Sequence, residues 1–387
     1  MSTLTIEPSD VLRRAHAVGT YYGFESLASA AHKNRGNGTK AAYPESLAVD
    51  TLDPQAREVA SFLKQVRDAG LSPSTGRPLF LWHTNIAAGR QAPKQIVIQF
   101  HALGADRAIA DAVLIRAIRS LATDITKLDS RLRLNSMGDR ETRGRLAGEL
   151  ASFFRKRGNT LPAECTDCAK KDVFAAAELL IATPECDGLP SSTDHLSEAS
   201  RKHFESVLEY LESTETPYEL APQLLSRGGT WNETCFEVTA GERFSAWGSR
   251  YNDLAKHFFK SIPSSVGAVI RITADALTGS KKSPAIAPVK EKSAPRFVFV
   301  HIGDEAKRES IKMADSLRKA RIPMTQVLGV ESLTEQMRVA DELNPRYLVI
   351  MGRKEALERS VILRERATHT ETFIPFDTLV DRLRAVA

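Results

Sequence analysis

Phe297-Val-Phe-Val-His-Ile302 decides the fold of the last third of this 387-residue chain. The run is short, apolar and rich in β-branched and aromatic side chains, and a Gly-Asp pair ends it, so it predicts a buried strand. A second run of this kind, Tyr347-Leu-Val-Ile-Met351, ends at a glycine. Between the two runs, the sequence predicts a shorter strand near residues 324–328, directly after Pro323.

Two stretches between these strands have the apolar spacing of a helix. Their apolar faces are formed by Ile311, Ala314, Leu317 and Ala320 in the first stretch and by Leu333, Met337, Ala340 and Leu343 in the second. Strands that alternate with helices in this way predict parallel β-α-β units with helices on the faces of the sheet. We therefore expect an α/β module over residues 296–387.

Residues 278–295 come immediately before this module and read Thr-Gly-Ser-Lys-Lys-Ser-Pro-Ala-Ile-Ala-Pro-Val-Lys-Glu-Lys-Ser-Ala-Pro. Their content of Pro, Lys and Ser, and the lack of any apolar periodicity, are typical of an extended linker. Residues 1–277 form the larger part of the chain, and we expect them to fold as a separate core.

The core mixes helical and strand patterns. We expect helices over residues 108–122, 143–156 and 198–213, a helix that starts at an Asp10 cap and ends near Gly19, strands over 95–100, 234–238 and 267–272, and a loop over 32–44. Together these elements predict an α+β domain built on an antiparallel sheet. A helical insertion is expected over about residues 140–215.

The composition is that of an ordinary globular protein, with 42% hydrophobic and 26% charged residues. No apolar run of about 18 residues predicts a membrane span, and the first ten residues lack the apolar segment of a signal peptide. Four cysteines in a chain of this length do not predict a disulfide scaffold, so we expect a reduced, cytoplasmic protein. The net charge of +5 lies entirely after residue 277. Polyanion binding and a mildly basic solvated surface both remain open.

Cys165-Thr-Asp-Cys168 is the obvious metal candidate. A zinc site needs about four ligands, and the nearby Cys186 and His195 have a spacing that matches no common zinc pattern. We therefore expect a helix-turn element here and no metal. Gly36-Asn-Gly38 and Arg227-Gly-Gly229 lack the spacing of phosphate-binding loops. Generic motifs thus assign no chemistry to this chain.

Several segments, taken together and in order, resemble the bacterial histidyl-tRNA synthetases, which are class II enzymes. These segments are Tyr21-Tyr-Gly-Phe24, Gly104-Ala-Asp-Arg-Ala-Ile-Ala-Asp-Ala112, Leu134-Asn-Ser-Met-Gly-Asp-Arg140, Cys165-Thr-Asp-Cys168, Pro217-Tyr-Glu-Leu220, Arg227-Gly228, Thr234-Cys-Phe-Glu237 and Gly248-Ser-Arg-Tyr251. The C-terminal module, with Ser332-Leu333 and Gln336, looks like the family's anticodon-binding domain. The resemblance implies a class II synthetase-like α+β core followed by an α/β anticodon-binding-like domain. It also implies a homodimer, with tRNA or another RNA as partner.

The family holds ATP with two arginines, because the charge of a phosphate is matched best by bidentate donors. Compared with the family's second class II motif, Leu81-Trp-His-Thr-Asn85 has Trp82 at the arginine, and Asn85 ends the run. Compared with the third motif, Arg271-Ile-Thr-Ala274 has Ala274 at the arginine. The resemblance therefore implies a pocket without either arginine. ATP and Mg²⁺ would be cofactors only if the site were active.

The residues that would bind histidine also differ from those of the family. Gln55, within Leu52-Asp-Pro-Gln-Ala-Arg57, replaces the carboxylate that pairs with the ammonium group of the substrate. Val97 and His101 stand at the positions of the family's Gln and Glu, and Trp231 ends a run that is one residue short. Arg227 and Tyr251 are retained, and Arg250, in the Gly248-Ser-Arg-Tyr251 turn, is a further residue of the expected pocket.

Loss of both ATP arginines and of three histidine-site groups is hard to compensate, since each charged contact contributes roughly 1.5–3 kcal/mol. We therefore expect a histidyl-tRNA synthetase-like protein that is not a competent histidine–tRNA ligase and has a tRNA- or RNA-linked binding or regulatory role. One alternative is an active, ATP-dependent histidine–tRNA ligase. The other is a regulatory subunit of a histidine-biosynthesis enzyme, a class that binds histidine but usually lacks the anticodon-binding domain.

Overall fold

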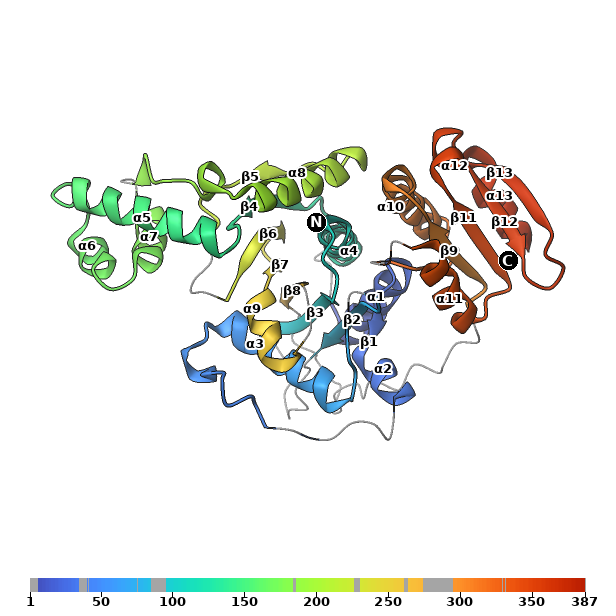
Figure 1. The fold of residues 1–387 in the computed structure, drawn as a ribbon, viewed down its shortest axis with the longest axis horizontal. Helices are drawn as coiled ribbons and strands as arrows, with labels where there is room; N and C mark the ends of the chain where they lie inside the picture. The colour runs from blue at the N-terminus through green and yellow to red at the C-terminus, as the bar shows by residue number, and fades with distance from the viewer. Residues whose placement is uncertain are drawn as a thin grey trace.

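The computed structural model describes residues 6–34, 40, 42–74, 76–84, 95–183, 186–225, 230–260, 264–273, 295–328, 330 and 332–386. A core around an eight-stranded sheet lies in the middle, with a helical insertion at one end and a C-terminal module around a five-stranded sheet at the other (Figure 1). Within the described ranges, no helix is long and apolar enough to cross a membrane.

The core sheet has the strand order β1-β2-β3-β8-β7-β6-β4-β5. Its strands are β1 (Glu25–Ser26), β2 (Leu79–Thr84), β3 (Gln95–Leu103), β4 (Arg131–Ser136), β5 (Glu219–Leu220), β6 (Asn232–Ala240), β7 (Phe244–Arg250) and β8 (Ser265–Thr273). The six central strands pair antiparallel, and the edge strands β1 and β5 run parallel to their neighbours. The predicted antiparallel sheet is therefore confirmed, except at its edges.

The helices of the core and of the insertion are α1 (Pro8–Tyr21), α2 (Leu27–Lys33), α3 (Pro54–Asp68), α4 (Ala108–Thr126), α5 (Arg140–Arg157), α6 (Ala163–Ala169), α7 (Val173–Ile181), α8 (Glu198–Ser213) and α9 (Asn252–Phe258), with 3-10 turns at Val49–Thr51 and Ser192–His195. The helices predicted over 108–122, 143–156 and 198–213 are confirmed as α4, α5 and α8. The start of the loop predicted over 32–44 is wrong, because α2 continues to Lys33.

The start of α1 also differs from the prediction. The helix begins at Pro8 after a Glu7 N-cap, and Asp10 lies inside its first turn, where it pairs with Arg13 and Arg14. Proline suits the first helical position because the amide hydrogen that it lacks would have no helical partner there. The prediction that Asp10 caps this helix is therefore wrong.

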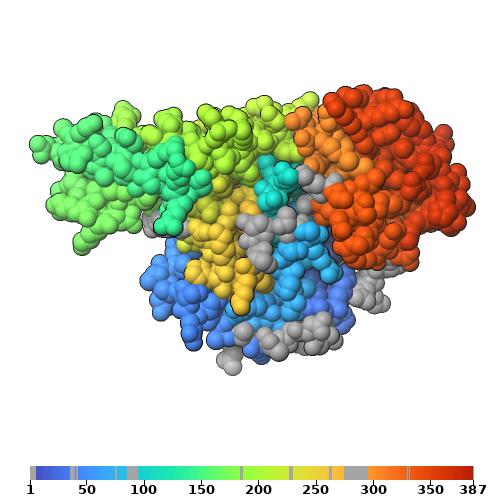
Figure 2. Space-filling view, in the orientation of Figure 1, coloured from blue at the N-terminus to red at the C-terminus, as the bar shows by residue number. Residues whose placement is uncertain are grey.

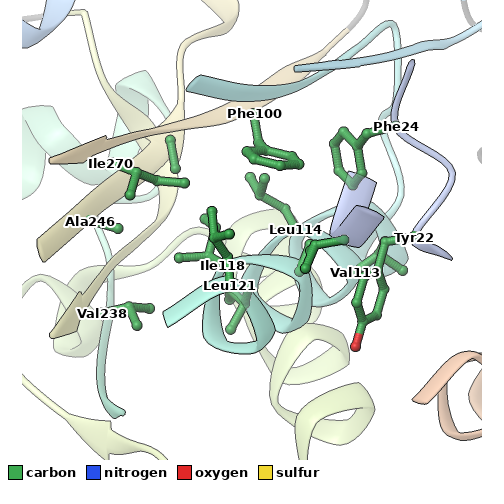
Figure 3. Packing of buried hydrophobic residues seen from close by; sticks show 14 of the residues in the cluster. Tyr22, Phe24, Phe100, Val113, Leu114, Ile118, Leu121, Val238, Ala246 and Ile270 are labelled. Atoms are coloured by element: carbon green, nitrogen blue, oxygen red, sulfur yellow. The ribbon is translucent and has the colours of Figure 1, made fainter. Parts of the chain in front are cut away.

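Side chains of the core sheet alternate between two faces. On the first, named here the α4 face, α4 packs beneath the strands together with α1 and α8. Figure 3 shows Leu114 and Ile118 of α4 directed toward Phe100 and Ile270 of the sheet. On the second, named the α3 face, α3 and α9 pack on the alternate residues of the same strands. Which alternate residues of a strand point toward α3, and which toward α4, therefore decides which side chains can line a site on either face.

The insertion consists of α5, α6 and α7 and lies at the end of the molecule opposite the module (Figure 1). Cys165 and Cys168 both lie in α6, and Cys165 is buried in an apolar cluster with Leu146 and Leu150 of α5. The predicted helical element around these cysteines is thus α6. In the part of the chain that the structure describes, no three His, Cys, Asp or Glu side chains are grouped to hold a metal ion.

The module's sheet has the strand order β10-β9-β11-β12-β13. Its elements are β9 (Phe297–His301), α10 (Asp304–Lys319), β10 (Thr325–Gln326), α11 (Leu333–Leu343), β11 (Tyr347–Met351), α12 (Arg353–Leu357), β12 (Ser360–Glu365), β13 (Glu371–Pro375) and α13 (Phe376–Val386). The predicted parallel pairing of the first three strands is confirmed, whereas β12 and β13 add an antiparallel hairpin that was not predicted. Three helices, α10, α12 and α13, pack on one face, and α11 packs on the other. The predicted linker, residues 278–295, lies outside the described residues except for Pro295.

Candidate functional site

The α3 face of the core sheet brings together five of the predicted site residues. They are Val97 and His101 on β3, Tyr251 directly after β7, Trp231 directly before β6 and Gln55 in the first turn of α3. Three of them, His101, Trp231 and Tyr251, are buried, whereas Val97 and Gln55 are half-buried. Three further predicted residues, Asn85, Arg227 and Ala274, lie outside the described residues.

His101 is the polar centre of this group. Its Nδ1 lies 2.8 Å from the hydroxyl oxygen of Tyr251, and its Nε2 lies 3.0 Å from Oε1 of Gln99. An amide oxygen only accepts, so Nε2 donates to Gln99 and Nδ1 accepts from the tyrosine hydroxyl. Burial, with a smaller effect of His83, holds the pKa of His101 well below its ordinary value. The ring is therefore neutral at pH 7.

Phe62 of α3 occupies the space in front of this imidazole. The two rings are stacked, with centroids 3.9 Å apart and planes inclined by 17°. Gly267 of β8 lies behind the imidazole, and a Cβ there would be 2.0 Å from Nδ1. The imidazole is thus enclosed by the protein's own side chains and backbone, which leaves no room beside it for a second planar ring.

Trp231, directly before β6, contacts the start of α3. Its indole nitrogen donates to Oδ2 of Asp53 over 2.9 Å, and the other carboxylate oxygen, Oδ1, accepts from the backbone amide of Ala56 at the start of α3. The indole also packs edge-on against Trp247, at a centroid distance of 4.6 Å. Both carboxylate oxygens of Asp53 are therefore used to fix α3 in place.

An ion pair that was not predicted joins α3 to β8. Nη2 of Arg271 lies 2.9 Å from Oε1 of Glu58. Burial raises the pKa of Glu58, and the guanidinium of Arg271 opposes that rise. The signal was present in the sequence, because Gln55, Glu58 and Phe62 follow each other at intervals of three and four residues and so share one helix face. This spacing places Glu58 and Phe62 beside Gln55, but it does not identify Arg271 or His101 as their partners.

Trp82, predicted at the position of an ATP arginine, lies on the α4 face. It pairs in register with Phe100, and both belong to the α4 cluster, whereas the neighbouring pair of Leu81 and His101 faces α3. The indole touches α1 so closely that a Cβ on Gly19 would lie 3.0 Å from its Cδ1 atom. Trp82 therefore cannot line a pocket that contains His101, and this part of the predicted site is wrong.

Arg250, another predicted site residue, also points to the α4 face. Its guanidinium pairs with both carboxylate oxygens of Asp111 on α4 and donates to the carbonyl oxygens of Ala105 and Arg107. Burial alone would raise the pKa of Asp111, but Arg250 and His203 outweigh it and hold this pKa at about 2. The arginine is therefore a strut between the sheet and α4, and it cannot contact a ligand on the α3 face.

Two cavities of the described surface lie away from these residues. One, of about 330 Å³, is lined by Glu7, Ser9, Asp10 and Arg13 at the start of α1. The other, of about 250 Å³, lies between β4, β5 and α8 and is mainly apolar. Neither is lined by a predicted site residue.

Known proteins resemble this chain in sequence. The family described as "Anticodon binding domain" matches residues 285–386. The chain is 28% identical over 300 residues to the histidine–tRNA ligase of Geobacillus sp. (strain WCH70), which covers 74% of this chain and 70% of that protein. It is 26% identical over 356 residues to the histidine–tRNA ligase of Rhodococcus erythropolis, and this alignment covers 86% of this chain and 80% of that protein. The solved apo histidyl-tRNA synthetase of S. aureus is 18% identical, covers 98% of both chains and has a TM-score of 0.46.

Proposed function

Because this chain belongs to the histidyl-tRNA synthetase family, we propose that it is a synthetase-like protein with an RNA-linked binding or regulatory role. In this proposal it is not a competent histidine–tRNA ligase. The observation that carries the proposal is the closed α3 face, where Phe62 stacks on His101 and both ring nitrogens of His101 are already bonded within the protein.

The chemistry of the remaining side chains on this face supports the same proposal. Gln55 offers an amide where an ammonium group would need a carboxylate, and a charge-assisted contact of that kind contributes roughly 1.5–3 kcal/mol. Arg271 carries the charge that a phosphate needs, but Glu58 engages it at 2.9 Å. A nucleotide would therefore have to break an existing ion pair before it could use this arginine.

The RNA-linked part of the proposal rests on the C-terminal module. The anticodon-binding match spans residues 285–386, and the whole positive excess of the chain lies after residue 277. A protein that binds RNA through phosphate contacts releases counterions, so its affinity falls steeply with salt. We further propose a cytoplasmic homodimer, divided into a core of residues 1–277, a linker of 278–295 and a module of 296–387.

ATP–pyrophosphate exchange with each of the twenty amino acids tests the loss of ligase chemistry. We expect no histidine-dependent exchange above background. Gln55→Glu, which restores a carboxylate to α3, serves as the matched variant and should stay equally inactive, because Phe62 still fills the space beside His101. Histidine-dependent exchange well above background by the unmodified chain would refute the proposal.

Binding of the full chain to a mixed tRNA pool tests the RNA-linked role. We expect the dissociation constant to rise steeply between 50 and 200 mM salt, by a factor of about ten for a few phosphate contacts. The same titration with a double-stranded DNA of equal charge separates RNA recognition from general polyanion binding. Equal affinity for both polymers, or no binding at low salt, would count against the role. Light scattering at micromolar concentration tests the homodimer, and a monomer would contradict it.

A further inference from the structure

The C-terminal module and the core share one apolar cluster. Ile311 and Ala314 of α10 and Leu328 after β10 are buried among residues of α1 and α4. Gly23, at the corner between α1 and β1, has a φ of +80°, and a Cβ there would lie 3.2 Å from the side chain of Leu328. A larger residue at Gly23 would therefore strain the backbone and push against the module.

A group of polar side chains lies beside this apolar contact. The ring of Tyr22 is buried, and its hydroxyl bonds with Ser120 of α4 at 2.9 Å and donates to Asp315 of α10. The other carboxylate oxygen of Asp315 pairs with Arg116 of α4. Figure 3 shows Tyr22 at the margin of the apolar cluster, with its hydroxyl turned away from Phe24. Asp315 is thus the shared acceptor of two donors from the core.

Two further ion pairs flank this group and spread the contact over several elements. Arg318 of α10 bonds to both carboxylate oxygens of Asp124 in α4, at 3.1 and 3.2 Å. Arg308, near the start of α10, lies 2.9 Å from Glu209 of α8. Figure 2 shows the orange surface of the module lying directly against the yellow-green surface of the core in this region. Contacts at three separated points fix the orientation of α10, not only its position.

We propose that the Tyr22–Gly23 corner is a docking site for the C-terminal module, and that Asp315 locks the module and the core into one rigid body. This accounts for the Tyr21-Tyr-Gly-Phe24 segment, to which the proposed site on the α3 face assigns no role. The carboxylate of Asp315 is largely removed from water, and its donors among the described residues, Tyr22 and Arg116, both belong to the core. Removing it leaves Arg116 and Tyr22 without their shared acceptor, which is a costly change at a buried contact.

A chain that can be cut between its two parts tests this inference. A site-specific protease sequence replaces residues 281–288, the purified full-length chain is cut, and the products are separated by size-exclusion chromatography at micromolar concentration. We expect the cut wild-type pieces to elute together. With Asp315→Ala, the affinity between the pieces should fall roughly hundredfold, so that they elute separately.

Asp304→Ala is the matched control, because it removes the same side chain from the same helix at a position whose ion-pair partner among the described residues is Lys307, within the module. Its cut pieces should stay together. If Asp315→Ala does not fold, Tyr22→Phe, which removes one hydroxyl, carries the test and should weaken the association about tenfold. Separate elution of the wild-type pieces, or unchanged association in Asp315→Ala and Tyr22→Phe, would overturn the inference. Neither readout involves RNA or histidine, so the result is independent of the proposed function.

Discussion

The two faces of the core sheet have different characters. On the α4 face, apolar side chains from α1, α4 and α8 form one cluster, and the buried charged pair on this face, Arg250 and Asp111, fixes a helix to the sheet. On the α3 face, polar and aromatic side chains meet and contact each other. The difference teaches that the two faces of one sheet can carry different kinds of side chain, because alternate residues of one strand contact different neighbours.

The largest effect is expected when one residue on each face is replaced by arginine. Trp82→Arg should lower the free energy of unfolding by roughly 5 kcal/mol or more, because it removes a buried indole and leaves a charge without a partner beside α1. Val97→Arg, at a half-buried position of the α3 face, should lower the free energy of unfolding by about 1 kcal/mol, because the long arginine side chain can reach water. Urea unfolding of both variants measures the difference. Equal losses would mean that the two residues do not face opposite sides.

A second test removes the strut of the α4 face. Arg250→Ala should lower the free energy of unfolding by about 3–5 kcal/mol, since the Asp111 carboxylate stays buried and loses its main partner. Arg131→Ala breaks a pair with Glu219 in which both side chains are at least half exposed. This control should change stability by no more than about 1 kcal/mol. If both variants unfold at the same urea concentration, Arg250 is not a strut.

A third test opens the α3 face. Phe62→Ala should cost about 3 kcal/mol and leave a cavity beside His101. Imidazole should then raise the melting temperature of this variant and not that of the wild type, because the new space borders the bonding groups of His101, Gln99 and Tyr251. Phe244→Ala, which opens a cavity on the apolar α4 face, is the control and should not respond to imidazole. No response in Phe62→Ala would show that its neighbours collapse into the space.

The smallest test uses pH to separate the faces. His101 has a folded-state pKa well below 6.5, so the unfolded chain binds more protons and stability falls as pH drops below about 6.5. Asp111 has a folded-state pKa of about 2 against 3.8. Its contribution of about 2 kcal/mol is present above pH 4 and is lost as pH falls toward 2.

Variants assign each pH window to its face. In His101→Gln, the urea midpoint should depend less on pH between pH 7 and 5 than in the wild type. The dependence that remains should come from the buried His301 of the module. The double change Asp111→Asn with Arg250→Met should flatten the dependence between pH 4 and 2. A wild-type slope that persists in either variant would place its titrating group elsewhere.

Elements with strong local patterns could be predicted from the sequence. The apolar spacing along α4 and the apolar run of β9 predict these elements from their own residues alone, and both predictions are confirmed. The start of α1 was missed because Asp10 is equally suited to a cap and to a first-turn pair with Arg13 and Arg14. In that case Pro8 decided the boundary.

The candidate site was harder to predict, because it depends on which face each strand turns toward α3. His101 and Tyr251 were assigned to one pocket, and the structure does bring them together. The resemblance also predicts Trp82 in this pocket. Trp82 pairs with Phe100, one residue away from His101, and successive side chains of a strand point to opposite faces, so Trp82 lies on the other face. Phe62 was missed because its importance comes from stacking on a residue 39 positions later in the chain, a contact that no local pattern contains.

The pairing of β3 with β8 has a consequence for how the chain is made. The partners in this pairing are between 162 and 178 residues apart in the sequence. At a synthesis rate of roughly 5–20 residues per second, β3 leaves the ribosome on the order of 10–30 s before its partner. During that time one edge of a nearly continuous apolar strand stays open to other nascent chains. We therefore expect the yield of this protein in a cell to fall when β3 is left unshielded before β8 has been synthesised.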